Sequence, residues 1–152
     1  MNLQQFPYSS DNLSYVIYGE HSALAIDGGA VEPILDFVDK KKLKLTHVTH
    51  THMHPDHTCG TRELLARSGA ALLDGAFLSG HSQFELDGMN VRVYATPGHT
   101  DDSVTFHVGN CLITGDTLFN GTIGNCFSGD IRAFYNSIKF LMTFHGDTLI
   151  YA

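Results

Sequence analysis

Apolar residues in the first third of the chain come in short blocks that end at glycines or polar turns. Residues 13–18 and 23–26 each predict a strand, and the polar residues 19–22 between them predict a hairpin turn. Within residues 33–42 the apolar positions recur at helical spacing, and lysines stand at the end where the helix dipole is negative. Residues 45–49 alternate and predict a strand that leads into a histidine-rich loop.

Strand and helix patterns continue to the end of the chain. Turn residues such as Asp87-Gly88 and Gly109-Asn110 separate the blocks. The predicted elements are a helix at residues 61–67, a buried strand at 70–73, a hairpin at 84–95 and strands at 104–108 and 111–114. A helix at 131–141, capped by Asp130, and a last strand at 148–151 follow. The order ββα-βαβ-ββ-ββ-αβ predicts one α/β domain over residues 1–152, with two sheets and helices outside them.

Size and charge narrow the class of protein. The chain has 152 residues and a formal net charge of −7, which argues against a nucleic-acid partner. No apolar run is long enough to cross a membrane, and residues 1–5 do not resemble a signal peptide. Three cysteines, Cys59, Cys111 and Cys126, are too few for a disulfide framework, so a reducing cytoplasm is the expected location.

Residues 50–57 contain four histidines and one aspartate. Pro55 excludes a regular helix through this cluster, so an extended or turning backbone is expected. In extended backbone, residues two apart point to the same side, and His52 and His54 are therefore expected to converge on one point. A polar surface loop is the alternative. Neutral imidazoles beside a carboxylate instead favour a site for zinc or a similar ion.

Further candidate ligands lie in the same loop and at the ends of later strands. Asp56 and His57 are sequence neighbours, so they are expected to point to a second position close by. His99 follows the turn at residues 97–98, and Asp116 follows an apolar strand. Alone, these two residues would be a turn histidine and a capping aspartate. Their position at strand ends, together with the histidine cluster, favours a role as ligands.

Residues 52–57, 96–100 and 114–119 resemble three motifs of the metallo-β-lactamase superfamily. Within it they are most similar to the branch of hydroxyacylglutathione hydrolase (glyoxalase II) and persulfide dioxygenase. The resemblance covers nearly the whole chain and implies an αββα four-layer sandwich. It implies a first metal held by His52, His54 and His99 and a second metal held by Asp56 and His57. It also implies that Asp116 bridges both metals and that Asp27 is a buried aspartate next to the ligands.

The chain departs from this family at two places. The family supplies one more histidine directly after a strand similar to residues 149–152, where this sequence stops. We therefore expect a domain that is incomplete at its C-terminus, without the helical region that helps to bind glutathione, and with a weak or empty second metal site. His145 is the nearest histidine, and we expect it in a loop. Asn125 stands where the family has a basic residue that contacts glutathione; Asn125 and Phe127 are candidate substrate contacts.

The predicted function is a metal-dependent hydrolase that cleaves thioesters in small thiol conjugates by attack of a metal-bound hydroxide. One or two zinc ions are expected, with iron or manganese possible, because a divalent ion brings the pKa of bound water close to 7. A thiolate has a reference pKa near 8.5 and leaves without a strong acid. Asp56 is the predicted catalytic residue, which orients the water. The alternatives are a mononuclear-iron persulfide dioxygenase that uses His52, His99 and Asp116, and an inactive metal-binding fragment.

Overall fold

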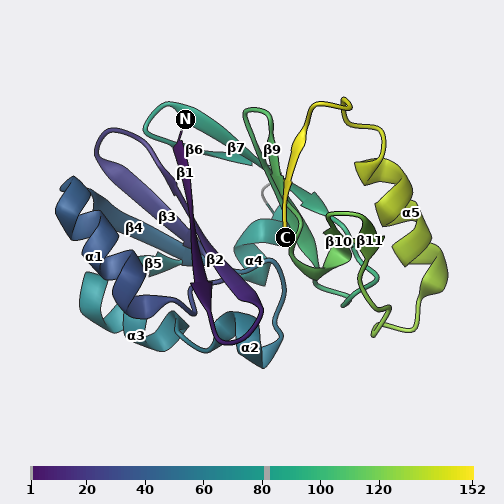
Figure 1. Cartoon of the computed structure of the whole chain (residues 1–152), viewed down its shortest axis with the longest axis horizontal. Helices are drawn as coiled ribbons and strands as arrows, with labels where there is room; N and C mark the ends of the chain where they lie inside the picture. Colours follow the sequence, from purple (N-terminus) through teal and green to yellow (C-terminus); the bar gives the residue numbers. More distant parts are fainter. Residues whose placement is uncertain (1, 81–82) are drawn as a thin grey trace.

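Two five-stranded sheets form the centre of the molecule in the computed structural model, which describes residues 2–80 and 83–152 (Figure 1). The first sheet has the order β1-β2-β3-β4-β5, and the second has the order β12-β9-β8-β7-β6. The first contains β1 (Asn2–Tyr8), β2 (Asn12–Tyr18), β3 (Ser22–Ile26), β4 (Lys44–Thr49) and β5 (Ala71–Leu72). The second contains β6 (Gln83–Leu86), β7 (Met89–Ala95), β8 (Val104–Val108), β9 (Cys111–Ile113) and β12 (Leu149–Tyr151).

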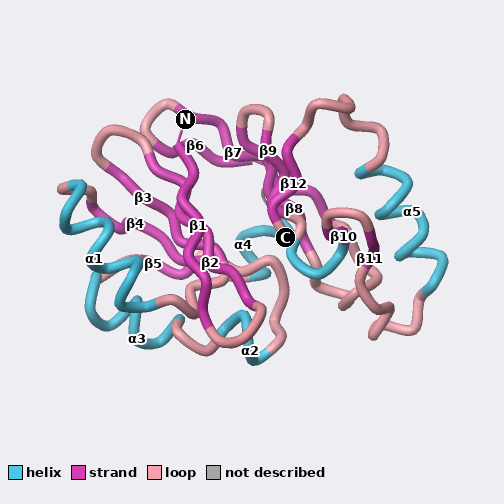
Figure 2. Tube along the Cα trace, in the orientation of Figure 1, coloured by secondary structure: helices cyan, strands magenta, loops and turns pink. Residues whose placement is uncertain are grey.

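The helices lie around the two sheets, as Figure 2 shows, and the one at residues 75–80 contributes Leu78 to the cluster between the sheets. They are α1 (Val31–Lys41), α2 (Pro55–Thr58), α3 (Thr61–Ser68), α4 (Gly75–Gly80) and α5 (Ile131–Leu141). A short ribbon, β10 (Leu118–Phe119) with β11 (Thr122–Ile123), follows a 3₁₀ turn at Gly115–Thr117. The arrangement is the predicted α/β sandwich, with α1 and α3 against the first sheet and α5 beside the second.

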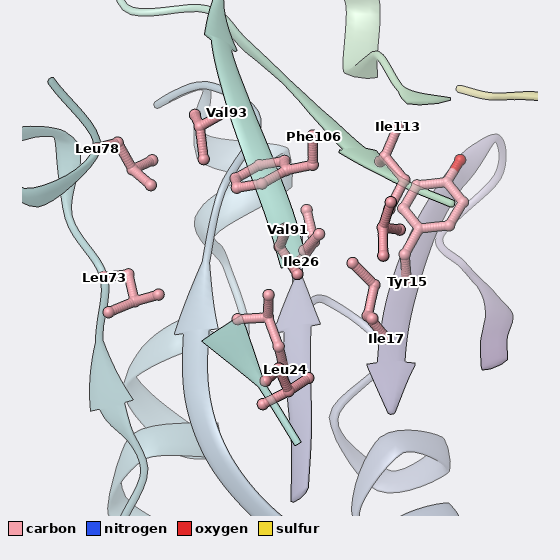
Figure 3. Close-up of a cluster of buried hydrophobic side chains, with 12 residues drawn as sticks. Tyr15, Ile17, Leu24, Ile26, Leu73, Leu78, Val91, Val93, Phe106 and Ile113 are labelled. Atoms are coloured by element: carbon pink, nitrogen blue, oxygen red, sulfur yellow. The ribbon is translucent and has the colours of Figure 1, made fainter. Parts of the chain in front are cut away.

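The core is divided by the alternation of side chains along the strands. On β2, Tyr15 and Ile17 point between the two sheets, where they meet Phe106 and Ile113 from the second sheet (Figure 3). Val16, between them in sequence, belongs to the other buried cluster, which packs under α1 and α3. Each face of the first sheet is therefore apolar, which explains the continuous hydrophobic run in β2.

Several elements differ from the sequence expectations. Strand β1 was not predicted, because its seven residues are polar or half-exposed and pair only with β2 at the sheet edge. Helix α4 and the β10–β11 ribbon were also missed, since they are too short for a periodic pattern. The prediction of a buried strand at residues 70–73 is wrong in extent and burial: β5 has two residues, and both are exposed.

The expectation for the histidine cluster needs one correction. The backbone is extended at His54, with φ −68° and ψ 143°, but Pro55 then begins the short helix α2. Proline fits the first helical position because its missing N–H has no partner there. The hairpin at Asp87–Gly88 and the cap of α5 are confirmed; Asp130 Oδ1 accepts a hydrogen bond from Ala133 N at 2.9 Å. No helix within residues 2–80 and 83–152 has the length and apolar character to cross a membrane.

Candidate metal centre

The candidate ligands come together because their strands end at one edge of the sandwich. Strands β3 and β4 are parallel, so their carboxyl ends coincide, and Asp27 follows one while the histidine loop follows the other. His99 lies in the loop after β7, and Asp116 lies in the 3₁₀ turn after β9. The sequence separation of these groups is large, but the sheet order brings them to a common position.

Three imidazoles form the first ligand group. His52 Nε2 lies 2.9 Å from His54 Nδ1, and His99 Nε2 lies 3.1 Å from the same atom. Donors about 2.0–2.1 Å from one tetrahedral ion are about 3.3 Å apart, so these separations fit a shared cation. His52 and His99 are 2% and 3% exposed, and burial restricts their rings to this arrangement. The predicted convergence of these three residues is present in the structure.

A second group adjoins the first and shares His52 with it. His52, His57 and Asp116 offer ligand atoms that all lie within 4.8 Å of one another. Asp116 Oδ1 is 3.5 Å from His57 Nε2, whereas Asp116 Oδ2 is 3.6 Å from His99 Nε2. The two oxygens of one carboxylate thus face the two groups, which is the placement that a bridging ligand needs.

Asp27 is a buried carboxylate that contacts both the histidine loop and His57. Its carboxylate is buried and accepts hydrogen bonds from the backbone N–H and the hydroxyl of Thr51, at 2.8 and 2.7 Å. Asp27 Oδ2 also lies 3.1 Å from His57 Nδ1, so the buried carboxylate attracts the protonated form of this ring. The predicted position of Asp27 next to the ligands is present, and its contacts orient both the start of the loop and the His57 ring.

Asp56 is the candidate that stands apart from both groups. Its side chain is largely exposed, and its Oδ2 lies 3.7 Å from His57 Nε2. The same oxygen accepts a hydrogen bond of 2.9 Å from Asn12 Nδ2, and the Tyr8 hydroxyl donates to the Asp56 backbone carbonyl at 2.9 Å. The sequence pattern did not indicate a role for Asn12 or Tyr8, because only the folded β1–β2 hairpin brings these residues to the histidine loop.

Residues 124–127 form the wall beside His99. His99 Nδ1 donates a hydrogen bond of 2.9 Å to the backbone carbonyl of Asn125, which leaves Nε2 free for a ligand role. Phe127 is 66% exposed, and its ring centroid is 5.7 Å from that of His54 and 5.2 Å from that of His99. Both residues predicted as substrate contacts thus lie next to the histidines, with Asn125 using its main chain toward His99.

Burial favours the neutral form of two of these imidazoles, His52 and His99. It lowers the pKa of His52 to about 3, with the neighbouring histidines adding to the effect, and it also lowers the pKa of His99. At His57, burial lowers the pKa, but the attraction of Asp27 and then of Asp116 outweighs it, so the net pKa is raised. Neutral imidazole is the ligand form, and burial therefore favours that form at His52 and His99.

Three of the cavities are lined by candidate ligands, and the smallest of them, of about 20 Å³, includes His52. One of about 320 Å³ is lined by His54, Thr100, Asp101, Asp102, Phe127 and Ser128. A smaller one, of about 110 Å³, includes His57, Asp116 and Asn12 in its lining. Another cavity, of about 490 Å³, is lined by residues such as Leu78 and Val93 and by none of the ligand histidines. The space against His54 is thus the larger of these cavities that contact a candidate ligand.

The donor set fits a divalent transition metal. Imidazole nitrogens and carboxylate oxygens suit zinc, iron and manganese, and the observed spacings allow one ion in the three-histidine group and a second beside Asp116. Two sheets between outer helices, with such a cluster at one edge, define a metal-binding α/β sandwich. The family model described as "Metallo-beta-lactamase superfamily" matches residues 10–73 and 68–152, and the chain therefore belongs to this superfamily.

Two curated relatives are similar to nearly the whole chain. It is 30% identical over 164 residues to a hydroxyacylglutathione hydrolase from Tolumonas auensis, covering 99% of this chain and 64% of the relative. The corresponding enzyme from Aeromonas salmonicida is 32% identical over 156 residues, covering 95% and 61%. The chain thus spans less than two thirds of the length of these relatives.

Solved structures agree on the fold. ETHE1 from Myxococcus xanthus superposes with a TM-score of 0.87 at 32% identity, covering 99% of this chain and 74% of that chain. A metallo-beta-lactamase from Staphylococcus aureus superposes with a TM-score of 0.84 at 22% identity, covering 99% and 54%, which supports the fold alone. These similarities bear out the resemblance and the four-layer sandwich predicted from the sequence.

Proposed function

We propose that this chain is a metal-dependent hydrolase of thioesters, in which residues 1–152 form one domain. The observation that supports this proposal most directly is the Asp116 carboxylate, with one oxygen toward the three-histidine group and the other toward His57. Such a pair of adjoining groups suits hydrolysis, and the curated relatives named above are hydroxyacylglutathione hydrolases.

In this proposal the residues divide into holding and orienting roles. His52, His54 and His99 hold the first ion, and Asp116 extends the site to a second ion with His57 and Asp56. A divalent metal held by these residues would supply a hydroxide nucleophile at neutral pH and would stabilise an oxyanion. Asp56, fixed through Asn12, orients the attacking water. The cavity against His54 and Phe127 receives the thiol part of the substrate.

The ion and the location are part of the same proposal. Zinc is proposed in one or two copies because nitrogen ligands predominate, and iron or manganese would fit the same donors. The substrate is proposed to be a small thiol conjugate. A cytoplasmic location is proposed on the three free cysteines, Cys59, Cys111 and Cys126.

A mononuclear-iron persulfide dioxygenase is the second candidate. The observation that favours it is the position of Asp56: its Oδ2 is bonded to Asn12, and its carboxylate belongs to neither ligand group. In this reading iron would use His52, His99 and Asp116, two histidines and one carboxylate, and Asp56 would not be a ligand. The motif resemblance includes the dioxygenase branch, so this candidate stands on two observations.

Metal analysis and two assays separate these functions. Purified protein would be examined by elemental analysis, by thioester cleavage with a thiol-reactive dye, and by oxygen uptake with a persulfide. Thioester cleavage that disappears in His54→Ala but persists in His145→Ala, an exposed histidine outside the site, supports the hydrolase. Iron content with oxygen uptake and without thioester cleavage supports the dioxygenase. Metal binding without either activity identifies an inactive metal-binding domain.

A further inference from the structure

The cavity of about 490 Å³ between α4 and the second sheet has no role in the chemistry described above. Voids inside proteins seldom exceed the size of a water molecule, whereas sites for organic ligands measure about 300–1,000 Å³. This cavity is in the second range. Its described lining is Gly75, Leu78, Val93, Ala95, Asp101, Asp102, Ser103 and Val104.

Small side chains on the inner face of the second sheet create this space. Residues two apart on a strand share a face, so Ala95 points to the same side as the buried Val93. Val93 pairs with Phe106, which fills the space between the sheets, whereas Ala95 pairs with the smaller Val104. Ala95 is exposed although it lies on the inward face, because nothing packs on it. On the α4 side, Gly75 has no side chain to fill the space.

The walls of this cavity are largely apolar. Leu78 and Val93 are only 9% and 6% exposed and belong to the cluster between the sheets (Figure 3). Ala95 and Val104 extend this surface, and the polar side chains of the described lining all come from residues 101–103. Water gains few hydrogen bonds against such walls, so the cavity favours a ligand group without polar atoms.

The apolar cavity adjoins the spaces at the first ligand group. It shares Asp101 and Asp102 with the cavity against His54, and it shares Gly75, Leu78 and Asp102 with the small cavity at His52. A substrate whose reactive carbon lies at these histidines can therefore extend one of its two arms into the apolar cavity. The other arm remains in the cavity against His54 and Phe127, which the proposed function assigns to the thiol part.

We propose that the acyl group of the substrate is a linear aliphatic chain of roughly six to eight carbons, which lies in this apolar cavity. This inference rests on the proposed thioester hydrolysis. In that reaction the oxygen of water bonds to the acyl carbon, the carbon–sulfur bond breaks, and the thiolate leaves with the electron pair while the proton passes to solvent. The chain itself contributes binding through the water that it displaces from the apolar walls.

A series of acyl groups on one thiol tests the proposal. The metal-loaded full chain would be assayed with acetyl, butanoyl, hexanoyl and octanoyl thioesters of N-acetylcysteamine. Each kcat/KM is divided by the rate of hydroxide-catalysed hydrolysis of the same compound. The expected gain is about three- to fourfold for each added methylene up to hexanoyl, because every methylene is buried on binding. The gain should come from a lower KM.

Variants of the lining locate the chain. Ala95→Leu narrows the cavity and is expected to lower the hexanoyl-to-acetyl ratio of kcat/KM about tenfold. Val104→Ala widens the cavity and is expected to extend the gain to octanoyl. The control is Ala71→Leu, the same change at an exposed position of β5 outside this lining, which should leave the ratio unaltered. Because both substrates are measured on one preparation, the ratio does not depend on the fraction of active protein.

Binding without turnover provides a second measurement. Ketone analogues of the acetyl and hexanoyl thioesters, with a methylene in place of sulfur, would be titrated by calorimetry into the metal-loaded chain. The hexanoyl analogue should bind more tightly and with a more negative heat-capacity change, and both differences should shrink in Ala95→Leu.

The outcomes separate this inference from the proposed function. Equal kcat/KM for the acetyl and hexanoyl thioesters overturns the inference while thioester hydrolysis stands. A preference for longer chains that Ala95→Leu and Ala71→Leu alter equally places the chain elsewhere and also overturns it. Cleavage of none of the four compounds overturns the hydrolase proposal and this inference with it.

Discussion

Single residues at this site are held by burial and by specific partners. His52 has almost no exposed surface, and His99 donates from Nδ1 to the Asn125 carbonyl. Asp27 orients His57 by charge. A neutral, oriented imidazole loses little freedom when it binds a metal, so this centre is prepared for an ion before the ion arrives.

Removing the metal should expose the cost of keeping His52 neutral. Its folded pKa of about 3 lies below the unfolded value of about 6.5, so below pH 6.5 only the unfolded chain takes up this proton. The free energy of unfolding should therefore fall by about 1.4 kcal/mol per pH unit between pH 6.5 and 5 from this residue alone. The raised pKa of His57 acts in the opposite sense, since its contribution is present at low pH and is lost as the pH rises through that value.

Urea unfolding of metal-free protein across this pH range checks the prediction. The curve of His52→Asn should be flatter than that of the unaltered chain by about that slope, whereas His145→Asn, which removes an exposed histidine, should follow the unaltered chain. Parallel curves for His52→Asn and the unaltered chain would contradict the assignment of a neutral buried His52.

Asn12 should act on catalysis through Asp56. Asn12→Ala removes the 2.9 Å hydrogen bond to Asp56 Oδ2 and lets an exposed carboxylate rotate. We expect kcat to fall about tenfold with KM nearly unchanged, because orientation of the water is lost and substrate contacts remain. Asn90→Ala, which removes a 3.2 Å hydrogen bond to Gln83 on the second sheet, is the control. Equal kcat values for both variants would exclude a positioning role for Asn12.

At the scale of elements, the site depends on short turns more than on long helices. The 3₁₀ turn at Gly115–Thr117 presents Asp116, and helix α2 has only four residues. Gly124 packs so closely that an added Cβ would lie 1.8 Å from the backbone carbonyl of Asp116. The spacing between this turn and the wall beside His99 therefore has no room for a side chain.

Gly124→Ala should displace the turn that carries Asp116. We expect weaker metal binding and at least a tenfold loss of activity, because a shift of about 1 Å at a catalytic group is sufficient for such losses. Gly146→Ala is the matched control, since an added Cβ there meets no atom within 4 Å. The measurements are metal content after dialysis and kcat/KM. Full metal retention and activity in Gly124→Ala would show that the wall moves freely.

At the scale of the whole molecule, the two sheets form a platform that holds the ligand loops. Phe106 has no exposed surface and lies in the cluster between the sheets with Tyr15, Ile17 and Ile113 (Figure 3). The loops that carry His99 and Asp116 leave the same second sheet, so the packing between the sheets also sets the distance between ligands from opposite halves.

Phe106→Ala should destabilise the fold by about 3–5 kcal/mol through lost burial and the cavity that remains. Phe127→Ala removes the same side chain from an exposed position and should cost less than about 1 kcal/mol while reducing substrate binding. Denaturant unfolding of the metal-free proteins measures both values. Equal losses for the two variants would contradict the assignment of Phe106 to the core and Phe127 to the surface.

Much of this architecture is visible in the sequence, and the omissions have physical causes. The pattern at residues 13–18 predicts β2, because a strand covered on both faces is continuously apolar. The polar β1 lacks such a pattern and is defined only by its pairing with β2. Proximity of His52 to His54 follows from local geometry. The positions of His99 and Asp116 were predicted from their motifs, and the sheet order explains why these positions meet.

The sequence by itself determined the fold class, the main strands and helices, and the identity of the candidate ligands, because periodicity and residue chemistry are local properties. Only the tertiary structure decided that Asp56 stands outside both ligand groups, which oxygen of Asp116 faces which group, and that Asn12 holds Asp56 at the edge of the site. Those features depend on contacts between residues tens of positions apart, and such contacts exist only once the sheets have packed.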